Sequence, residues 1–93
     1  INDILQERNE FIDFINTKTP WIAYPSKANF VLINLGSEKI AIGLSDYFNE
    51  NDIIVRRLTI NPFKNCVRIT IVDHDKMQKI KAVIIKYAAG RSH

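Results

Sequence analysis

The chain has 93 residues, of which 46% are hydrophobic and 25% charged, and its formal net charge is +3. These values are ordinary for one small folded domain and exclude a disordered chain. No apolar run approaches the roughly 20 residues of a membrane-spanning helix, and a mild positive charge does not predict nucleic-acid binding, which needs a clustered basic face.

Cysteine and histidine are too scarce for a disulfide or a zinc site. Cys66 is the only cysteine, and His74 and His93 are the only histidines. Neither an internal disulfide nor a zinc ligand set can be assembled from them, so we expect no metal and a reducing, cytoplasmic setting. The neighbouring Arg68 would lower the pKa of the Cys66 thiol, but no histidine base is predicted nearby, and we expect no nucleophile.

The two ends of the chain look like those of an excised piece. Ile1 lacks an initiator Met and stands inside an expected helix, so we expect residues to be missing before it. The ending "AAGRSH" resembles the remnant of an expression tag. We therefore expect one domain over residues 1–88 and assign residues 89–93 to the tag.

The first half of the chain predicts a helix, two extended pieces and a second helix. The first helix, Asn2 to about Thr17, has an apolar stripe at helical spacing, with polar residues on its other faces. The stripe is Ile4, Leu5, Phe11, Ile12 and Ile15, and the polar faces hold Glu7, Arg8, Glu10 and Asp13. The sequence "WIAYPSKANFVLINL" is extended and broken at "PSK"; its second piece is apolar on both faces, which is typical of an inner strand. Ser37 is the expected N-cap of the second helix.

The second half predicts two more strands and a third helix. "IIVRRL" and "CVRITIV" are extended, a loop containing Pro62 joins them, and Asp73 is the expected cap of the last helix. His74 is expected on the surface at the start of that helix. The order is α-β-β-α-β-β-α, which predicts an α/β (α+β) domain: a two-layer sandwich of a small, mostly antiparallel sheet with helices on one face.

Two arginines are expected on the sheet face opposite the helices. Side chains alternate along a strand, so Val67, Ile69 and Ile71 should lie beneath the first and third helices. Arg68 then projects from the other face, and the same alternation places Arg56 and Ile54 there. A solvated face is usually more polar than this one, so we expect it to meet another domain. Solvated arginines, or an Arg68 paired with an acidic side chain, are the alternatives without a specific ligand.

Three stretches carry a resemblance to a known family. "YPSKANFVLI", "NDIIVRRL" and "CVRITI" follow one another in the order and spacing of the C-terminal small domain of fold-type I pyridoxal-phosphate-dependent aminotransferases. The resemblance covers nearly the whole chain and is greatest to the histidinol-phosphate aminotransferase branch. It implies an amino-acid (histidine) biosynthetic, homodimeric parent enzyme with pyridoxal phosphate bound by an upstream large domain.

The resemblance also implies roles for residues. The arginine of the "Arg-Ile-Thr" strand, here Arg68, binds the substrate carboxylate, and the arginine of the "Val-Arg" strand, here Arg56, binds the substrate phosphate. Asn29 matches a structural asparagine. The cofactor-binding lysine belongs to the large domain, so no catalytic residue is expected here and the isolated chain is expected to be inert and to bind no cofactor.

The sequence departs from the family pattern at two glycines. Val72 replaces the glycine after the last strand, and Asn51 and Asp52 stand near the position of the other; Asn and Asp reach left-handed backbone geometry less easily than glycine. A phosphothreonine decarboxylase small domain, which shares this fold, remains an alternative. So does a stand-alone ferredoxin-like regulatory module that binds an amino acid or a partner protein.

Overall fold

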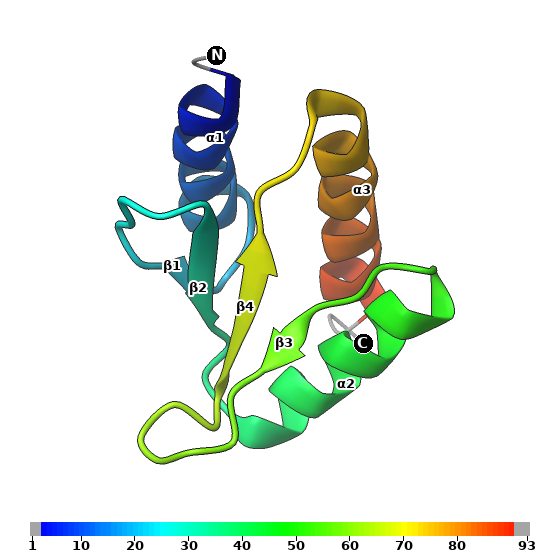
Figure 1. Ribbon diagram of the computed structural model, residues 1–93. Helices are drawn as coiled ribbons and strands as arrows, with labels where there is room; N and C mark the ends of the chain where they lie inside the picture. The colour runs from blue at the N-terminus through cyan, green and yellow to red at the C-terminus, as the bar shows by residue number, and fades with distance from the viewer. Residues whose placement is uncertain (1–2, 91–93) are drawn as a thin grey trace.

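The computed structural model describes residues 3–90 (Figure 1). Its helices and strands occur in the predicted order, which confirms the α+β class. They are α1 (Asp3–Lys18), β1 (Ile22–Ala23), β2 (Phe30–Asn34), α2 (Glu38–Glu50), β3 (Arg56–Arg57), β4 (Cys66–Thr70) and α3 (His74–Gly90). None of these helices is long and apolar enough to cross a membrane. Of the expected tag, Ala89 and Gly90 continue α3, and residues 91–93 lie outside the described residues.

The four strands form one antiparallel sheet in the order β1-β2-β4-β3. The strand expected to be internal, β2, lies between β1 and β4, as its two apolar faces predict. In Figure 1, α1 is seen behind β1 and β2, whereas α2 and α3 appear beside β3 and β4. α1 contacts β1 and β2, α2 contacts β3 and β4, and α3 contacts the other two helices. The expectation that the first and third helices cover the last strand was therefore incomplete, because α2 also contacts β4.

Alternation along β4 separates the core from the open face. Val67, Ile69 and Ile71 are at most 3% exposed and belong to the hydrophobic core, as predicted. Their neighbours across the sheet, Val31 and Ile33, are fully buried on the same side. Because a one-residue slip would turn all of these side chains toward the open face, burial strongly specifies the register of β2 and β4.

Local signals in the sequence fix the helix ends. The hydroxyl of Ser37 accepts a hydrogen bond from the backbone N–H of Ile40, and the Asp73 carboxylate accepts one from the N–H of Lys76, so both predicted caps are present. After α2 the chain reverses at Asp52, whose φ of 63° is left-handed. Asp52 thus adopts a left-handed geometry that aspartate reaches less easily than glycine.

The first helix buries a carboxylate that was expected on its polar side. Glu7 is 7% exposed, whereas Ile4 and Leu5, placed on the apolar stripe, are 38% and 49% exposed. Spacings of four residues put Glu7 on one line with the fully buried Phe11 and Ile15. The prediction was wrong because the side of the helix that carries Glu7, Phe11 and Ile15 faces the rest of the molecule. Ile4 and Leu5, in the first turn, do not lie on that side.

Glu7 is paired with a residue far away in the sequence. Its Oε2 lies 2.6 Å from Nδ1 of His74, the first residue of α3, and this contact ties α1 to α3. The histidine is exposed, as predicted, but its partner was not foreseen. Hydrogen bonding to Glu7 and the attraction of its negative charge raise the pKa of His74 above its ordinary value of 6.5.

The Glu7–His74 pair should make stability depend on pH. A histidine with a raised pKa in the folded state stabilises the fold fully below its unfolded-state pKa, and this contribution is lost as pH rises through the folded-state pKa. We expect the melting temperature of the wild type to fall between pH 6 and 8 by more than that of His74→Gln. If the melting temperatures of the two proteins fall by the same amount across this pH range, the pair is not formed.

The burial pattern also predicts which isoleucines stabilise the fold. Ile33 is fully buried between two strands, whereas Ile85 on α3 is 42% exposed. Ile33→Ala should lower the free energy of unfolding by about 2–5 kcal/mol through lost burial and a residual cavity. Ile85→Ala should cost less than about 1 kcal/mol. Urea titrations of both variants measure the difference, and equal losses would contradict this assignment of the core.

Candidate anion-binding site

Arg68 occupies the centre of the open face. It lies in the middle of β4, with Leu32 of β2 and Arg56 of β3 as its direct partners across the sheet. Directly opposed residues project from the same face, so the three side chains form a row. Arg68 is half-buried and Arg56 is exposed. The structure thus places both arginines on the predicted face and adds that they are immediate neighbours.

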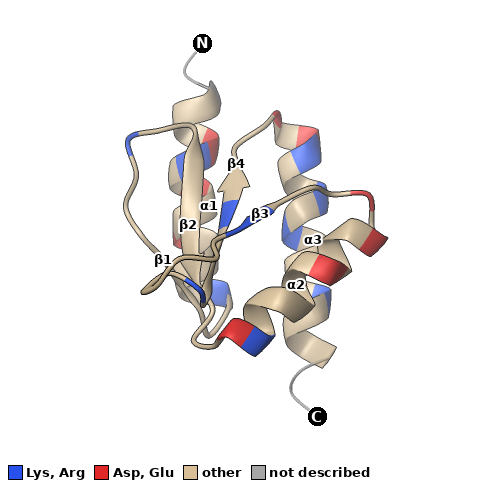
Figure 2. Ribbon diagram, turned by 60° about the horizontal axis from the view of Figure 1, so that its bottom comes forward, with Lys and Arg blue, Asp and Glu red and all other residues tan. Residues whose placement is uncertain are grey.

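Two like charges in directly opposed positions repel each other. Within residues 3–90, neither Arg56 nor Arg68 forms an ion pair or a side-chain hydrogen bond with a protein group. Figure 2 shows basic segments of β3 and β4 side by side with no acidic segment between them. The row therefore offers two adjacent guanidinium groups to an anion from outside the described chain.

Arg57, the next residue in β3, has a different environment. It pairs with Val67 and so projects toward the helices, where its Nη1 lies 3.6 Å from Oε2 of Glu38. The two atoms form an ion pair but are too far apart for a hydrogen bond. Nη1 has no hydrogen-bond partner among the described residues. Arg57 is thus a matched control for the two open-face arginines.

An aromatic ring orients the guanidinium of Arg68. Its Cζ lies 4.8 Å from the centroid of the Phe30 ring, a cation–π contact. The Nε of Arg68 is buried and lacks a hydrogen-bond partner, whereas the two terminal nitrogens are not buried. The planar end of the side chain therefore presents its terminal N–H donors to a ligand while the ring covers the inner part.

Two shallow hollows flank the arginine row. One, of about 380 Å³, is lined by Tyr24, Pro25, Ser26, Phe30, Leu32 and Phe63. The other, of about 530 Å³, extends from Arg56 through the loop to Phe63, which borders both. An anion held by the arginines would thus have apolar surface on either side for the rest of its molecule.

A polar network fixes the edge of this face. Asn34 Nδ2 donates to the Tyr24 hydroxyl at 2.9 Å, and Asn65 Nδ2 donates to Asn34 Oδ1 at 2.8 Å. The sequence did not suggest this network, although the polar Asn34 in an otherwise apolar strand was a signal. Tyr24 is on the open face, whereas Trp21 is buried within the domain beside Tyr87.

The other candidate residues take no part in the arginine row. Cys66 is 2% exposed, and burial raises the pKa of its thiol, so the expected lowering by Arg68 was wrong. Asn29 is exposed, and its carbonyl accepts a hydrogen bond from the N–H of Ile71, which extends the β2–β4 pairing by one step. Residues 3–90 contain no cluster of three or more His, Cys, Asp or Glu side chains that could hold a metal ion.

Comparison with known proteins confirms the resemblance expected from the motifs. The chain is 28% identical over 88 residues to a histidinol-phosphate aminotransferase of Vesicomyosocius okutanii, a match covering 94% of this chain and 24% of that protein. No protein-family model matches the chain.

Two solved structures are also similar. The histidinol-phosphate aminotransferase of Sinorhizobium meliloti, in complex with pyridoxal-5'-phosphate, superposes with a TM-score of 0.85 at 20% identity, over 95% of this chain and 24% of that one. The enzyme of Clostridium acetobutylicum gives a TM-score of 0.76 at 30% identity, over 94% and 27%. The chain thus spans about a quarter of the length of these proteins.

The arginine row should bind inorganic phosphate. A ligand that binds only the folded state at ten times its dissociation constant stabilises it by about 1.4 kcal/mol. We expect phosphate to raise the melting temperature of the wild type and of Arg57→Gln at constant ionic strength. The increase should be smaller in Arg56→Gln and Arg68→Gln. Equal increases in all four proteins would reveal a general salt effect and contradict a specific site.

Proposed function

We propose that this chain is the C-terminal small domain of a longer pyridoxal-phosphate-dependent aminotransferase of the histidinol-phosphate type, and that it supplies two substrate-binding arginines. The matches to such enzymes cover nearly all of this chain and about a quarter of each enzyme, which supports the first part. The adjacent, unpaired Arg56 and Arg68 on the open face support the second. This arginine pair is the observation that carries the proposal.

Arg68 binds the substrate carboxylate in this proposal. A guanidinium offers parallel N–H donors in the geometry of a carboxylate and stays charged at every relevant pH. The Phe30 ring holds the group on the open face, so little side-chain freedom is lost when the substrate binds. A fixed carboxylate orients the substrate amine, which is the positioning contribution to catalysis.

Arg56 binds the substrate phosphate. A phosphate has more acceptor oxygens than one guanidinium uses, and Arg56 is the more exposed member of the row. Because Arg56 directly opposes Arg68, both can also approach a single anionic group. Bound anion would remove the repulsion between the two charges, which links substrate binding to the stability of this sheet edge.

The residues of this chain do not fit the cofactor itself. Pyridoxal phosphate supplies the electron sink of transamination and needs a lysine whose amine is desolvated. Every lysine within residues 3–90 is at least partly exposed. We therefore place the cofactor and the catalytic residues in an upstream large domain, with the 93-residue chain alone inert. The proposal includes a homodimeric, cytoplasmic parent enzyme of histidine biosynthesis.

The two alternatives are distinguishable. A ferredoxin-like module has the element order β-α-β-β-α-β, which differs from the order of this chain. A decarboxylase small domain would keep both arginines but would serve an enzyme that releases CO₂. Assays of CO₂ release and of amino-group transfer on the full-length protein separate the last two activities.

Kinetics of the full-length enzyme test the arginine roles. Arg68→Ala should lower kcat/KM for an aromatic amino acid roughly 100-fold or more, because loss of a bidentate charged pair costs on the order of 3 kcal/mol. Arg68→Lys should restore only part of this loss, since an ammonium lacks the planar fork. Arg56→Ala should lower kcat/KM strongly for histidinol phosphate and little for the aromatic amino acid.

Thermal melting controls for damage to the fold. Both arginines lie off the core face, so the variants should melt close to the wild type, as should the control Arg57→Ala apart from its loss of the Glu38 pair. If Arg68→Ala leaves kcat/KM within about threefold of the wild type, or unfolds the protein, Arg68 does not bind the substrate carboxylate.

A further inference from the structure

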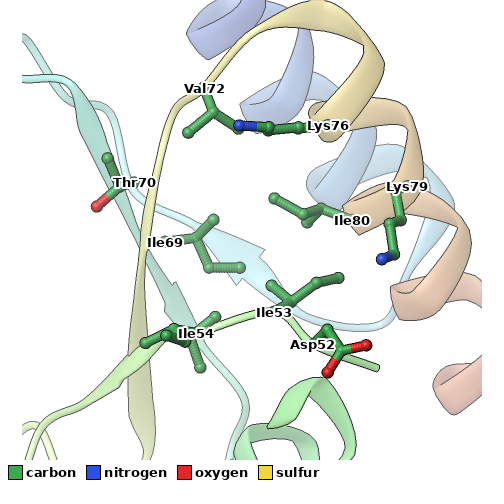
Figure 3. A pocket seen from close by; sticks show the side chains of 10 residues that line it. Asp52, Ile53, Ile54, Ile69, Thr70, Val72, Lys76, Lys79 and Ile80 are labelled. Carbon is green, nitrogen blue, oxygen red and sulfur yellow. The ribbon is translucent and has the colours of Figure 1, made fainter. Parts of the chain in front are cut away.

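Within residues 3–90, the arginine row has no carboxylate beside it. Neither of the two hollows that flank the row is lined by an aspartate or a glutamate. Glu38 pairs with Arg57 on the helix side of the sheet. The acidic residue closest to β3 in the sequence, Asp52, lines a third hollow between β4 and α3. Figure 3 shows Asp52 across that hollow from Thr70, on the side of Lys79.

The titratable side chains on the neighbouring segments are not carboxylates either. Tyr24 and Lys27 precede β2, and Lys64 is half-buried in the loop between β3 and β4. Cys66 is a buried thiol, and burial raises its pKa. The row is therefore a local excess of positive charge, which a bound anion has to neutralise.

The row offers hydrogen-bond donors and no acceptor. The guanidinium groups of Arg56 and Arg68 can only donate, and Leu32 and Phe30, the β2 residues beside Arg68, are apolar. A protonated phosphate oxygen would direct its own O–H donor at these donors. A fully deprotonated phosphate presents acceptors only, so each of its oxygens can accept an N–H hydrogen bond.

The number of charges distinguishes the classes of anion that suit the row. A carboxylate or a sulfate monoester carries one negative charge, so part of the repulsion between Arg56 and Arg68 persists when it binds. A phosphate monoester carries about two negative charges above its second pKa of about 6 and can neutralise both groups. Even in bulk water, one more charge contact at ion-pair distance changes a binding constant about fivefold.

We propose that the arginine row selects phosphate monoesters in their doubly charged form over singly charged anions of the same shape. The proposal rests on the proposed function, under which Arg56 binds the substrate phosphate, and it adds the charge state that the site requires. Because the row binds the dianion better than the monoanion, affinity for a phosphate monoester falls as the pH drops through the second pKa of the ester.

Calorimetric titration of the full-length protein tests this proposal, with pyridoxal phosphate bound so that the phosphate site of the cofactor is filled. Phenyl phosphate and phenyl sulfate have the same shape and differ in charge. At pH 7.5 phenyl phosphate should bind at least about tenfold more tightly, because its second charge acts on two arginines. Between pH 7.5 and pH 5 its affinity should fall about five- to tenfold, and that of phenyl sulfate less than about twofold.

Arg56→Gln and Arg57→Gln are a matched pair of variants. Arg56→Gln leaves one guanidinium in the row, so the preference for phenyl phosphate should fall to about fivefold or less. Arg57→Gln removes a neighbouring charge that projects from the other side of the sheet, and it should keep the preference of the wild type.

The contrary results separate this proposal from the proposed function. Equal affinities for the two esters, or a phenyl phosphate affinity independent of pH, with both esters weakened by Arg56→Gln, would refute selection by charge and keep the anion site. A preference that survives Arg56→Gln would also refute it, because its origin would lie outside the row. Binding of neither ester, or binding of both unchanged in Arg56→Gln, would overturn the selection together with the phosphate role of Arg56.

Discussion

The register of β4 between β2 and β3 is the constraint on which the site depends. It is held by the burial of Val67, Ile69 and Ile71, none of which contacts a ligand in the proposed function. Because side chains alternate, burying these three forces Arg68 onto the open face, and the pairing with β3 brings Arg56 beside it. Packing on one side of the sheet thus determines charge placement on the other.

That placement has an energetic consequence. Two adjacent guanidinium groups repel each other, and the described residues offer them no neutralising carboxylate, although Arg57 one position away has Glu38. The Phe30 ring partly offsets the repulsion through its contact with Arg68. A site with two positive charges and no neutralising carboxylate is suited to an anionic substrate, because the bound anion relieves the repulsion between the two arginines.

Much of this could be predicted from sequence, because period-two and helical patterns are local. They gave the element order, the caps at Ser37 and Asp73, and the faces of both arginines. Long-range pairing was not predictable in the same way: the burial of Glu7 depends on His74, 67 positions away. The divergence of β3 from β4 also escaped prediction, since "IIVRRL" has strand character throughout but only two of its residues pair.

A crystal structure of the full-length protein with histidinol phosphate bound would test the central claim most directly. Histidinol phosphate has no carboxylate, so its phosphate is the single anionic group that both arginines can approach. We predict phosphate oxygens at about 2.7–2.9 Å from guanidinium nitrogens of Arg56 and Arg68, the distance of charge-assisted hydrogen bonds. The Phe30 ring should still cover the inner part of the Arg68 side chain. A structure in which Arg68 is paired with a carboxylate side chain of the upstream domain, and the ligand binds elsewhere, would contradict the account.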